Sequence, residues 1–511
     1  MFSKKTQFIP ISFLSLFLTA CSFHTKPFTE EDRQKKALSD REKIREHTPL
    51  PTKPITFYEA LARGIKYNLD HRVKTLEEAY ALNLSNIADW DMLPPITTSA
   101  GYSRRSNVLA SNSQSIATGK QSLETSTSTD NNRRLFDLGV LWNVLDFGTA
   151  YFTARQKSDE AKIAQLRRQK VLQNMAFDIR NAYWRAVTAE LLLKEVDQVI
   201  DLGYGALKNA RRLEKERIQP LPISLNYQKI ILGAISKLFK QRRELAMAKA
   251  ELASLMNLEP GTQFEVETIH KKKLNLPEVN ISVDALENIA LLHRPEVWEE
   301  DYNKRISKNE IYKLYTSFFP GINLEARRNY DSNSFLYNQS WTDFSAKLGL
   351  NLFKMLATPT RLRAERQKGS VISTRRLALS MAILTQIHLS LERYSIAKKE
   401  YVFSKQIDRV NTKIASISKS KVQAELEDNL KLIEDKSSEI VGRVRRYASY
   451  TEVQNAYGRL INSLGVNPFP MIITEDLDEM TRLIESHLSK TELRLDEQSL
   501  LSFTVNTNTA S

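Results

Sequence analysis

A ten-residue stretch decides the fold: Phe136-Asp137-Leu138-Gly139-Val140-Leu141-Trp142-Asn143-Val144-Leu145. Large apolar side chains stand at every second position from Phe136 to Val144, with Asp137, Gly139 and Asn143 between them. This period of two predicts a β-strand with one apolar and one polar face. A strand of about ten residues fits a half-buried strand of a soluble antiparallel sheet, or a strand of a transmembrane barrel.

A second stretch of the same design lies at residues 344–353. Phe344, Ala346, Leu348 and Leu350 alternate with smaller or polar residues there, and residues 349–353 resemble residues 141–145. Two more alternating segments, about 96–106 and 321–330, each follow a helical stretch and a proline. Because these prolines, Pro94 and Pro320, are 226 positions apart, the chain reads as two copies of one helix–strand–strand–helix pattern.

Long segments outside the strands repeat apolar residues every seven positions. A sustained heptad repeat makes helices wrap around their neighbours, and small residues let them approach closely. The longest pair of rows is Leu172, Ile179, Ala186, Leu193, Ile200, Leu207 and Met175, Ala182, Ala189, Val196, Gly203, Ala210. Shorter rows are Ile231, Leu238, Leu245, Leu252, then Leu377, Leu384, Leu391, and finally Leu426, Ile433, Ile440, Tyr447.

These patterns divide the chain into five parts. Residues 1–20 are a signal peptide, 21–55 a linker, 56–258 the first repeat, 282–466 the second repeat, and 467–511 a C-terminal segment. Strands are expected at about 96–106, 135–145, 321–330 and 343–353, and helices at 150–217, 222–257, 357–424 and 428–463. The longest helices would extend about 100 Å. In each repeat, two shorter helices placed end to end nearly match the length of one long helix. Each repeat therefore supplies two helical columns, and the two repeats together predict a slender wall of four.

The N-terminus has the layout of an export signal. Lys4 and Lys5 precede a short apolar stretch that ends at Leu18-Thr19-Ala20-Cys21. This run resembles a bacterial lipobox, so Cys21 is the predicted lipidation site; an ordinary signal with a chance cysteine is the alternative. Ser22 favours the outer membrane over the inner membrane.

Beyond residue 21 there is no apolar run of about 18 residues, so the sequence predicts no transmembrane helix. A chain that crosses a membrane must then do so with β-strands. Four strands leave open edges, and single-chain barrels begin at about eight strands, so at least one more copy is needed. Three copies would supply twelve strands.

Composition excludes several classes of function. The formal charge of +14 comes from 74 Lys and Arg against 60 Asp and Glu, spread along helices, which indicates a mildly basic surface rather than a nucleic-acid site. One cysteine and seven scattered histidines favour neither disulfides nor a metal site. Without a phosphate-binding loop or a nucleophile elbow, we expect no enzyme activity and no cofactor.

In combination, the lipobox, the paired halves, Arg294-Pro295-Glu296 and the turn Leu145-Asp146-Phe147-Gly148 resemble the TolC-type outer-membrane efflux family over about residues 56–466. The resemblance implies a mainly α protein with a β part: a homotrimer with an α-helical barrel of coiled-coil helices and a twelve-stranded transmembrane β-barrel in outer-membrane lipid. It implies an exit duct for drug efflux or type I secretion, working with a periplasmic adaptor protein and an inner-membrane transporter. Lipidated members resemble the pump-associated branch.

The resemblance also implies a constriction at the periplasmic tip, with acidic rings and ionic contacts. On that basis Glu427, Asp428 and Glu434 are candidate ring carboxylates, and Arg217 and Lys421 are candidate locking partners. Ordinary solvated charges on a coiled coil are the alternative. The tips at 218–222 and 417–421 lack the family's usual glycine, and the turn at 353–359 lacks Asp-x-Gly.

A different function class stays open from the sequence. The chain could be a lipid-anchored periplasmic coiled-coil adaptor or scaffold without membrane-spanning strands. The two copies of the strand pair argue against this alternative. The sequence does not identify the cargo.

Overall fold

The computed structural model describes residues 27–496 except 123, 217–219, 260, 269–273, 317, 425–428 and 470–473. The chain divides into two units, residues 1–50 and 51–511. In the first unit, helix α2 (Glu30–His47) begins with a capping box. The Thr29 hydroxyl accepts the Asp32 amide at 3.2 Å, and the Asp32 carboxylate accepts the Thr29 amide at 3.1 Å. Cys21 lies outside the described residues.

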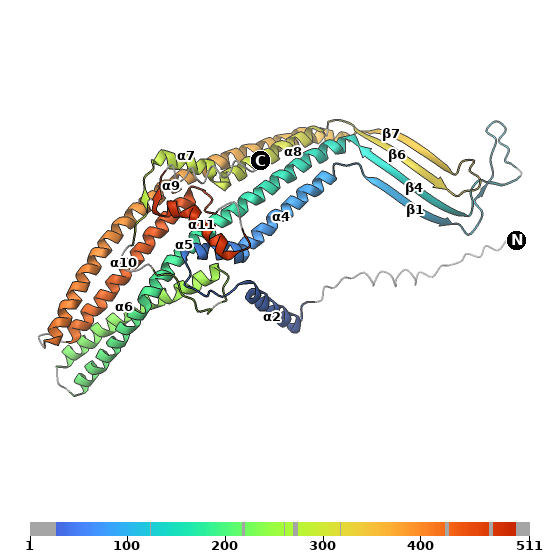
Figure 1. The fold of residues 1–511 in the computed structure, drawn as a ribbon. Helices are drawn as coiled ribbons and strands as arrows, with labels where there is room; N and C mark the ends of the chain where they lie inside the picture. Colours follow the sequence, from blue (N-terminus) through green and yellow to red (C-terminus); the bar gives the residue numbers. More distant parts are fainter. Residues whose placement is uncertain are drawn as a thin grey trace. The chain divides into compact units, whose positions relative to one another are not determined.

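In the second unit, the main elements occur twice in the same order (Figure 1). The first series is α3 (Phe57–Tyr67), α4 (Leu69–Trp90), β1 (Ile96–Arg104), β4 (Asn132–Asn143), α5 (Val144–Lys215) and α6 (Leu221–Leu255). The second is α7 (Val283–His293), α8 (Pro295–Thr316), β6 (Gly321–Asp331), β7 (Ser340–Gly349), α9 (Leu352–Gln423) and α10 (Asn429–Ser463). Corresponding helices have equal lengths of 11, 22, 72 and 35 residues. The predicted mainly helical fold with a smaller β part is confirmed.

Four strands form one antiparallel sheet in the order β1-β4-β6-β7. The pairing of β4 with β6 joins the two series, and β1 and β7 are the edges. One row across the sheet contains Thr98, Leu138, Arg328 and Thr342, each opposite the next. Side chains directly opposite one another share a face, so the register assigns every strand residue to one of two faces.

Two strands lead almost directly into the long helices because an asparagine caps each helix. The Asn143 side-chain oxygen accepts the amides of Leu145 at 3.0 Å and Asp146 at 3.1 Å, and Asn351 accepts the Lys354 amide at 2.9 Å. Helices α5 and α9 therefore begin at residues 144 and 352, earlier than the predicted 150 and 357. Val144 belongs to the helix and not to the strand.

The helices pack side by side in one layer. Helix α5 packs on α4 and α8, and further along on α6 and α10, while α9 packs on α8 and then on α10. In α5 the predicted second row is buried throughout. In α9 the predicted row packs only in part, since Leu377 is 67% exposed whereas Leu391 packs against the main core. The row that packs there contains Ile387, Tyr394, Tyr401, Asp408 and Ala415, and polar atoms in it hid its heptad spacing.

The motif Arg294-Pro295-Glu296 holds the start of α8 against the end of α10. Arg294 is buried and donates to the carbonyl oxygen of Ser463 at 3.3 Å and to Gln386 at 3.2 Å. Its Nε lies 3.3 Å from Glu296, which also pairs with Lys170 at 2.7 Å. Burial would raise the pKa of Glu296, but the hydrogen bond from Lys170 and the nearby cations lower it on balance.

A left-handed residue ends the last helix of each series. Gly465 follows α10 with φ +70°, and its carbonyl accepts a hydrogen bond from Gln173 at 2.6 Å. Asn257 follows α6 with φ 57°. Near it, the Asn68 side chain donates to the Leu255 carbonyl at 3.1 Å, as Arg294 donates at the end of α10. The two helix ends are therefore closed in similar ways.

Hydrogen bonds join the two connections at the far end of the sheet. The connection between β1 and β4 contains a short hairpin of β2 (Ala110–Ser111) and β3 (Ser126–Thr127). Asn333, in the β6–β7 connection, accepts the Asp130 amide at 2.9 Å and donates to the Ser128 carbonyl at 3.0 Å. Ser334 donates to Asp130 at 2.9 Å. These bonds tie the longer connection to the shorter one.

A small C-terminal part packs on the start of the second unit. Helix α11 (Leu477–Leu493) contacts α3, and β8 (Arg494–Leu495) pairs in parallel with β5 (Glu278–Val279). Ile484 and Leu495 are fully buried. The C-terminal segment thus completes the largest hydrophobic core, around α3 and α5.

Candidate functional site

One face of the four-stranded sheet is rich in charge. Arg327 lies 2.5 Å from Glu325 and 3.9 Å from Asp137, and Arg133 lies 3.3 Å from Asp331. Other members of this face are Ser99, Asn329, Asp343, Ser345 and Lys347, with Leu135, Leu141 and Trp341 among them. The face therefore offers a hydrated surface of both signs.

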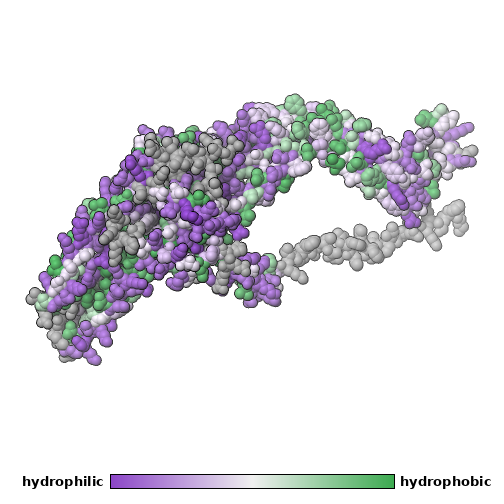
Figure 2. Space-filling view, in the orientation of Figure 1, coloured by the Kyte–Doolittle hydropathy of each residue, from purple (hydrophilic) through white to green (hydrophobic). Residues whose placement is uncertain are grey.

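The opposite face carries large apolar side chains that the rest of the described chain leaves exposed. Phe344 is 81% exposed and Leu348 is 72% exposed. Figure 2 shows apolar residues gathered on the surface where the long helices meet the sheet. Further members of this face are Ile96, Phe136, Leu138, Val140, Trp142, Ile322 and Leu324. An apolar surface of this extent marks a site for a partner chain or for lipid.

Of the five tip residues singled out from the sequence, Arg217, Glu427 and Asp428 lie outside the described residues. Glu434 is exposed on α10 and pairs with Lys431 of its own helix at 3.4 Å. Lys421 stands in the last turn of α9, where the helix dipole favours a cation. Their proposed roles in a constriction remain predictions.

A buried polar network near the tips was missed by the sequence reasoning. Asp408 of α9 pairs with Arg446 of α10 at 3.0 Å. Asp435 of α10 accepts from the Ser418 hydroxyl of α9 at 2.5 Å and pairs with Lys431 at 3.2 Å. The hydrogen bond to Asp435 is the main reason why the pKa of Lys431 is raised. The only available signal was an acidic residue on a heptad row, at Asp408.

A further ionic group links the two helical hairpins. Arg443 of α10 lies 2.8 Å from Glu439 of its own helix and also pairs with Glu195 of α5. Lys436 pairs with Glu439 at 2.7 Å. A cation held between two carboxylates on neighbouring helices fixes the register of α10 against α5.

Two open grooves flank this network. One of about 880 Å³ lies between α5, α9 and α10 and includes Leu202, Tyr227 and Lys419 in its lining. The other, of about 610 Å³, lies between α6, α9 and α10 and includes Lys229 and Glu434. Both grooves are open, and their volumes are large enough to accept side chains of another helix.

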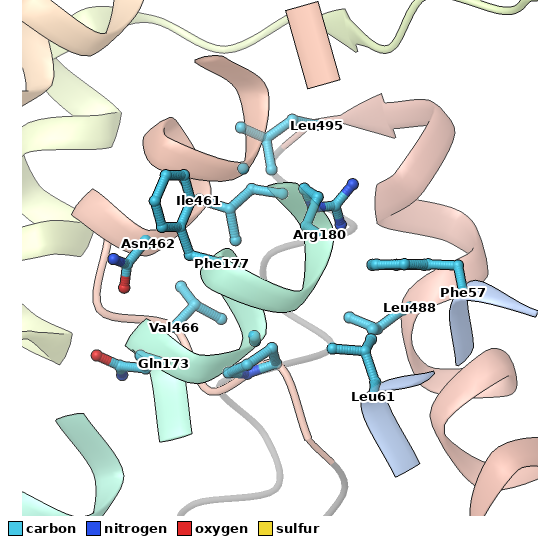
Figure 3. A pocket seen from close by; sticks show the side chains of 13 residues that line it. Phe57, Leu61, Gln173, Phe177, Arg180, Ile461, Asn462, Val466, Leu488 and Leu495 are labelled. Atoms are coloured by element: carbon cyan, nitrogen blue, oxygen red, sulfur yellow. The ribbon is translucent and has the colours of Figure 1, made fainter. Parts of the chain in front are cut away.

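A small cavity beside α3 is a poor candidate for cargo. It measures about 40 Å³, room for water but far below the roughly 300 Å³ of a small-molecule site. Figure 3 shows Phe57, Leu61 and Leu488 on one side of the view and Phe177, Ile461 and Val466 on the other. The guanidinium of Arg180 lies 4.7 Å from the centre of the Phe57 ring. The cavity is a packing defect under the C-terminal segment.

Among the described residues, no three His, Cys, Asp or Glu side chains gather where a metal ion could bind. Within the same residues, no helix combines the length and the apolar content that a membrane span requires.

No family model matches the chain, and no curated protein matches its sequence. Solved structures with the same fold are outer-membrane channels. OprN, described as an outer-membrane channel, has a TM-score of 0.61 at 14% identity, covering 80% of this chain and 89% of OprN. The Campylobacter jejuni CmeC outer membrane channel has a TM-score of 0.62 at 14% identity, covering 86% and 90%. CusC, described in terms of transmembrane channel formation, has a TM-score of 0.61 at 15% identity, covering 82% and 98%.

Proposed function

We propose that this chain is one subunit of a trimeric outer-membrane channel-tunnel that serves as the exit duct of an efflux system. One observation carries the proposal: within the part of the chain that the structure describes, the layer of helices and strands has an edge without a partner on each side. On one side lie β1, α4 and α6, and on the other lie β7 and α9. Edges of this kind are satisfied when copies join head to tail into a closed ring.

The free side of α9 carries a second heptad row. Its members stand two residues after the buried row, about 200° around the helix. Each is between 46% and 65% exposed: Leu389, Ile396, Phe403, Val410 and Ile417. A row with this spacing is the signature of a helix seam that awaits a partner.

The opposite side of the layer offers matching seams. On α6 the exposed row is Leu225, Leu232 and Phe239. On α4 it is Leu69, Val73, Leu76, Tyr80, Ile87 and Trp90. Because the two sides differ in sequence, the contact is heterologous and closes only as a ring.

Ring closure would also pair β7 of one copy with β1 of the next, so that no strand edge meets lipid. Two copies supply eight strands and three supply twelve. Three agrees with the resemblance to the efflux family, and twelve strands enclose a wider lumen than eight, as a duct requires. In such a barrel the charged face would line the lumen and the apolar face would meet lipid.

The helical hairpins would continue the duct on the periplasmic side, with the constriction near the tips. Glu427, Asp428 and Glu434, with Arg217 and Lys421, stay our candidates for the gate. No nucleotide site supplies energy in the described residues, so an inner-membrane transporter would drive export. A periplasmic adaptor helix would dock in the two grooves beside Tyr227 and Glu434. Acylation at Cys21 would anchor each chain in the outer membrane.

A matched pair of substitutions tests the ring. Phe403→Glu places a charge on the exposed seam of α9, and Val402→Glu places the same charge one residue away, off the seam, at a residue 46% exposed. We expect the detergent-purified wild type and Val402→Glu to have three times the chain mass. Phe403→Glu should be a folded monomer without channel conductance in a planar bilayer. Equal behaviour of the two variants would contradict the seam.

The same measurement separates the channel from an anchored scaffold. A channel predicts steady conductance from the wild type, and Glu427→Ala with Asp428→Ala should raise it or reduce its cation preference. Folded protein that forms no conducting pore would favour the scaffold.

A further inference from the structure

The arginines on the two faces of the sheet differ in their acidic partners. On the charged face, every arginine has an acidic partner: Arg133 pairs with Asp331, and Arg327 with Glu325. The apolar face also holds three arginines, Arg104, Arg134 and Arg328. At the strand positions that share this face, from 96 to 104, 132 to 142, 322 to 330 and 340 to 348, there is no Asp or Glu.

These three arginines are exposed, and no carboxylate of the described residues pairs with them. For Arg328, the described contact is a hydrogen bond to the Thr342 hydroxyl at 3.1 Å. Within the described residues, the guanidinium groups of Arg104 and Arg134 take part in no ion pair. The face therefore carries three uncompensated positive charges.

All three arginines lie toward the loop ends of their strands, away from the helices. Arg104 is the last residue of β1, Arg134 the third of β4, and Arg328 the fourth from the end of β6. Two exposed tyrosines stand among them, Tyr102 directly opposite Arg134 and Tyr330 two residues after Arg328. Most apolar side chains of the face lie on the helix side, but Leu138 lies directly opposite Arg328 and Phe136 directly opposite Tyr330.

Along the strands, the apolar band therefore begins at the helices, overlaps the rows of Arg328 and Tyr330, and is followed by Tyr102, Arg134 and Arg104 before the loops. In a barrel in lipid, aromatic rings occupy the interface between hydrocarbon and headgroups. Arginine is destabilising at the middle of the hydrocarbon, and this penalty becomes small near the interface. The arginines therefore belong at headgroup depth, where lipid phosphates lie.

From this arrangement we propose that Arg104, Arg134 and Arg328 form a binding surface for the phosphate groups of anionic membrane lipid. The inference rests on the proposed function, since it requires the apolar face to meet lipid. A guanidinium binds phosphate through two parallel hydrogen bonds, and no acidic side chain on this face competes for it. The apolar band beside the arginines would hold the acyl chains of the same lipid.

The test compares a triple variant with a charge-matched control. Arg104→Gln, Arg134→Gln and Arg328→Gln are combined in one protein. The control combines Arg72→Gln, Arg211→Gln and Arg409→Gln, which remove the same charge from exposed positions on helices. Both are purified as oligomers in detergent, and lipid A, a phosphorylated lipid, is titrated in while native mass spectrometry counts bound lipid.

We expect at least about tenfold weaker lipid A binding by the sheet variant, with the control equal to the wild type. Equal binding by both variants would overturn the inference. Complete displacement of lipid A by an equal concentration of inorganic phosphate would also overturn it, because the site would then bind the free ion. If the triple variant loses its helical circular dichroism, Arg104→Gln with Arg134→Gln replaces it.

Conductance of the same preparations keeps the two proposals separate. If the triple variant conducts and binds lipid A as well as the wild type does, the proposed lipid-binding surface is refuted and the proposed channel is not. If the wild-type oligomer neither conducts nor closes into a ring, the proposed channel is refuted, and the lipid-binding surface that rests on it is refuted too.

Discussion

Replacement of Gly465 by alanine tests the closure at the end of α10. Gly465 has φ +70°, a conformation that costs an L-residue with a side chain about 1–2 kcal/mol. A Cβ atom there would lie 2.7 Å from Arg294 Cα, 2.8 Å from Arg294 N and 2.8 Å from His293 C. All three are backbone atoms, so no side-chain rotation relieves the overlap.

The expected loss is the sum of two effects. Overpacking of this kind typically costs about 1–3 kcal/mol. With the backbone strain, Gly465→Ala should lower the free energy of unfolding by about 2–5 kcal/mol. The hydrogen bonds of Arg294 to the end of α10 would weaken as α8 moves away.

The assay is urea unfolding in detergent, followed by far-UV circular dichroism at one protein concentration. Gly205→Ala is the control, because an added Cβ there has no atom within 4 Å. It lies inside α5, so alanine should stabilise the helix by up to about 1 kcal/mol. Asn257→Gly, at the corresponding end of α6, should be neutral or slightly stabilising. If Gly465→Ala and Gly205→Ala unfold at the same urea concentration, the explanation of the Arg294 junction is wrong.

Three further predictions concern other parts of the second unit. Asn143→Ala and Asn351→Ala should each cost about 1 kcal/mol, measured by the same unfolding assay, whereas Asn143→Asp should retain the cap. Asp408→Ala leaves Arg446 beside α9 without its carboxylate and should lower the free energy of unfolding by about 3–5 kcal/mol. Adding Arg446→Ala should recover part of that loss. If the effects of the two substitutions are simply additive, the two side chains are not coupled. Burial lowers the pKa of His71 and His293 below the ordinary value of 6.5, so both bind protons more readily in the unfolded chain. Thermal stability should therefore be complete above pH 6.5 and fall below it, and His71→Gln should flatten this dependence.

The order of strands and helices could be predicted from the sequence because both types of element follow from local periodicity. Alternation around Leu138 and heptads around Ala186 are each visible within a single segment. The helix caps were also within reach, since Asn143 and Asn351 stand at the same place in two similar segments. The similarity of residues 141–145 and 349–353 does not by itself distinguish a cap from a strand residue, so the starts that the sequence predicts for both long helices are too late.

Features that depend on contacts between distant segments could not be predicted from the sequence. The contact of β4 with β6 joins strands far apart in the chain, and no local pattern specifies it. Likewise Asp408 meets Arg446 only because α9 and α10 pack in one particular register. At the tips, the candidate residues follow from the resemblance to the efflux family and do not include Asp435. The role of Asp435 depends on Ser418 in the facing helix, which no local pattern indicates.

The equal lengths of corresponding helices restrict how this chain can change in length. Helices α5 and α9 have 72 residues each, and α6 and α10 have 35 each, all within one layer. A deletion or insertion in α5 alone would put its seams out of step with α6, α8 and α10. Only additions of whole heptads keep the seams facing inward, and the same addition would be required in all four helices. Lengthening this protein therefore demands four coordinated insertions, whereas its loops can grow one residue at a time.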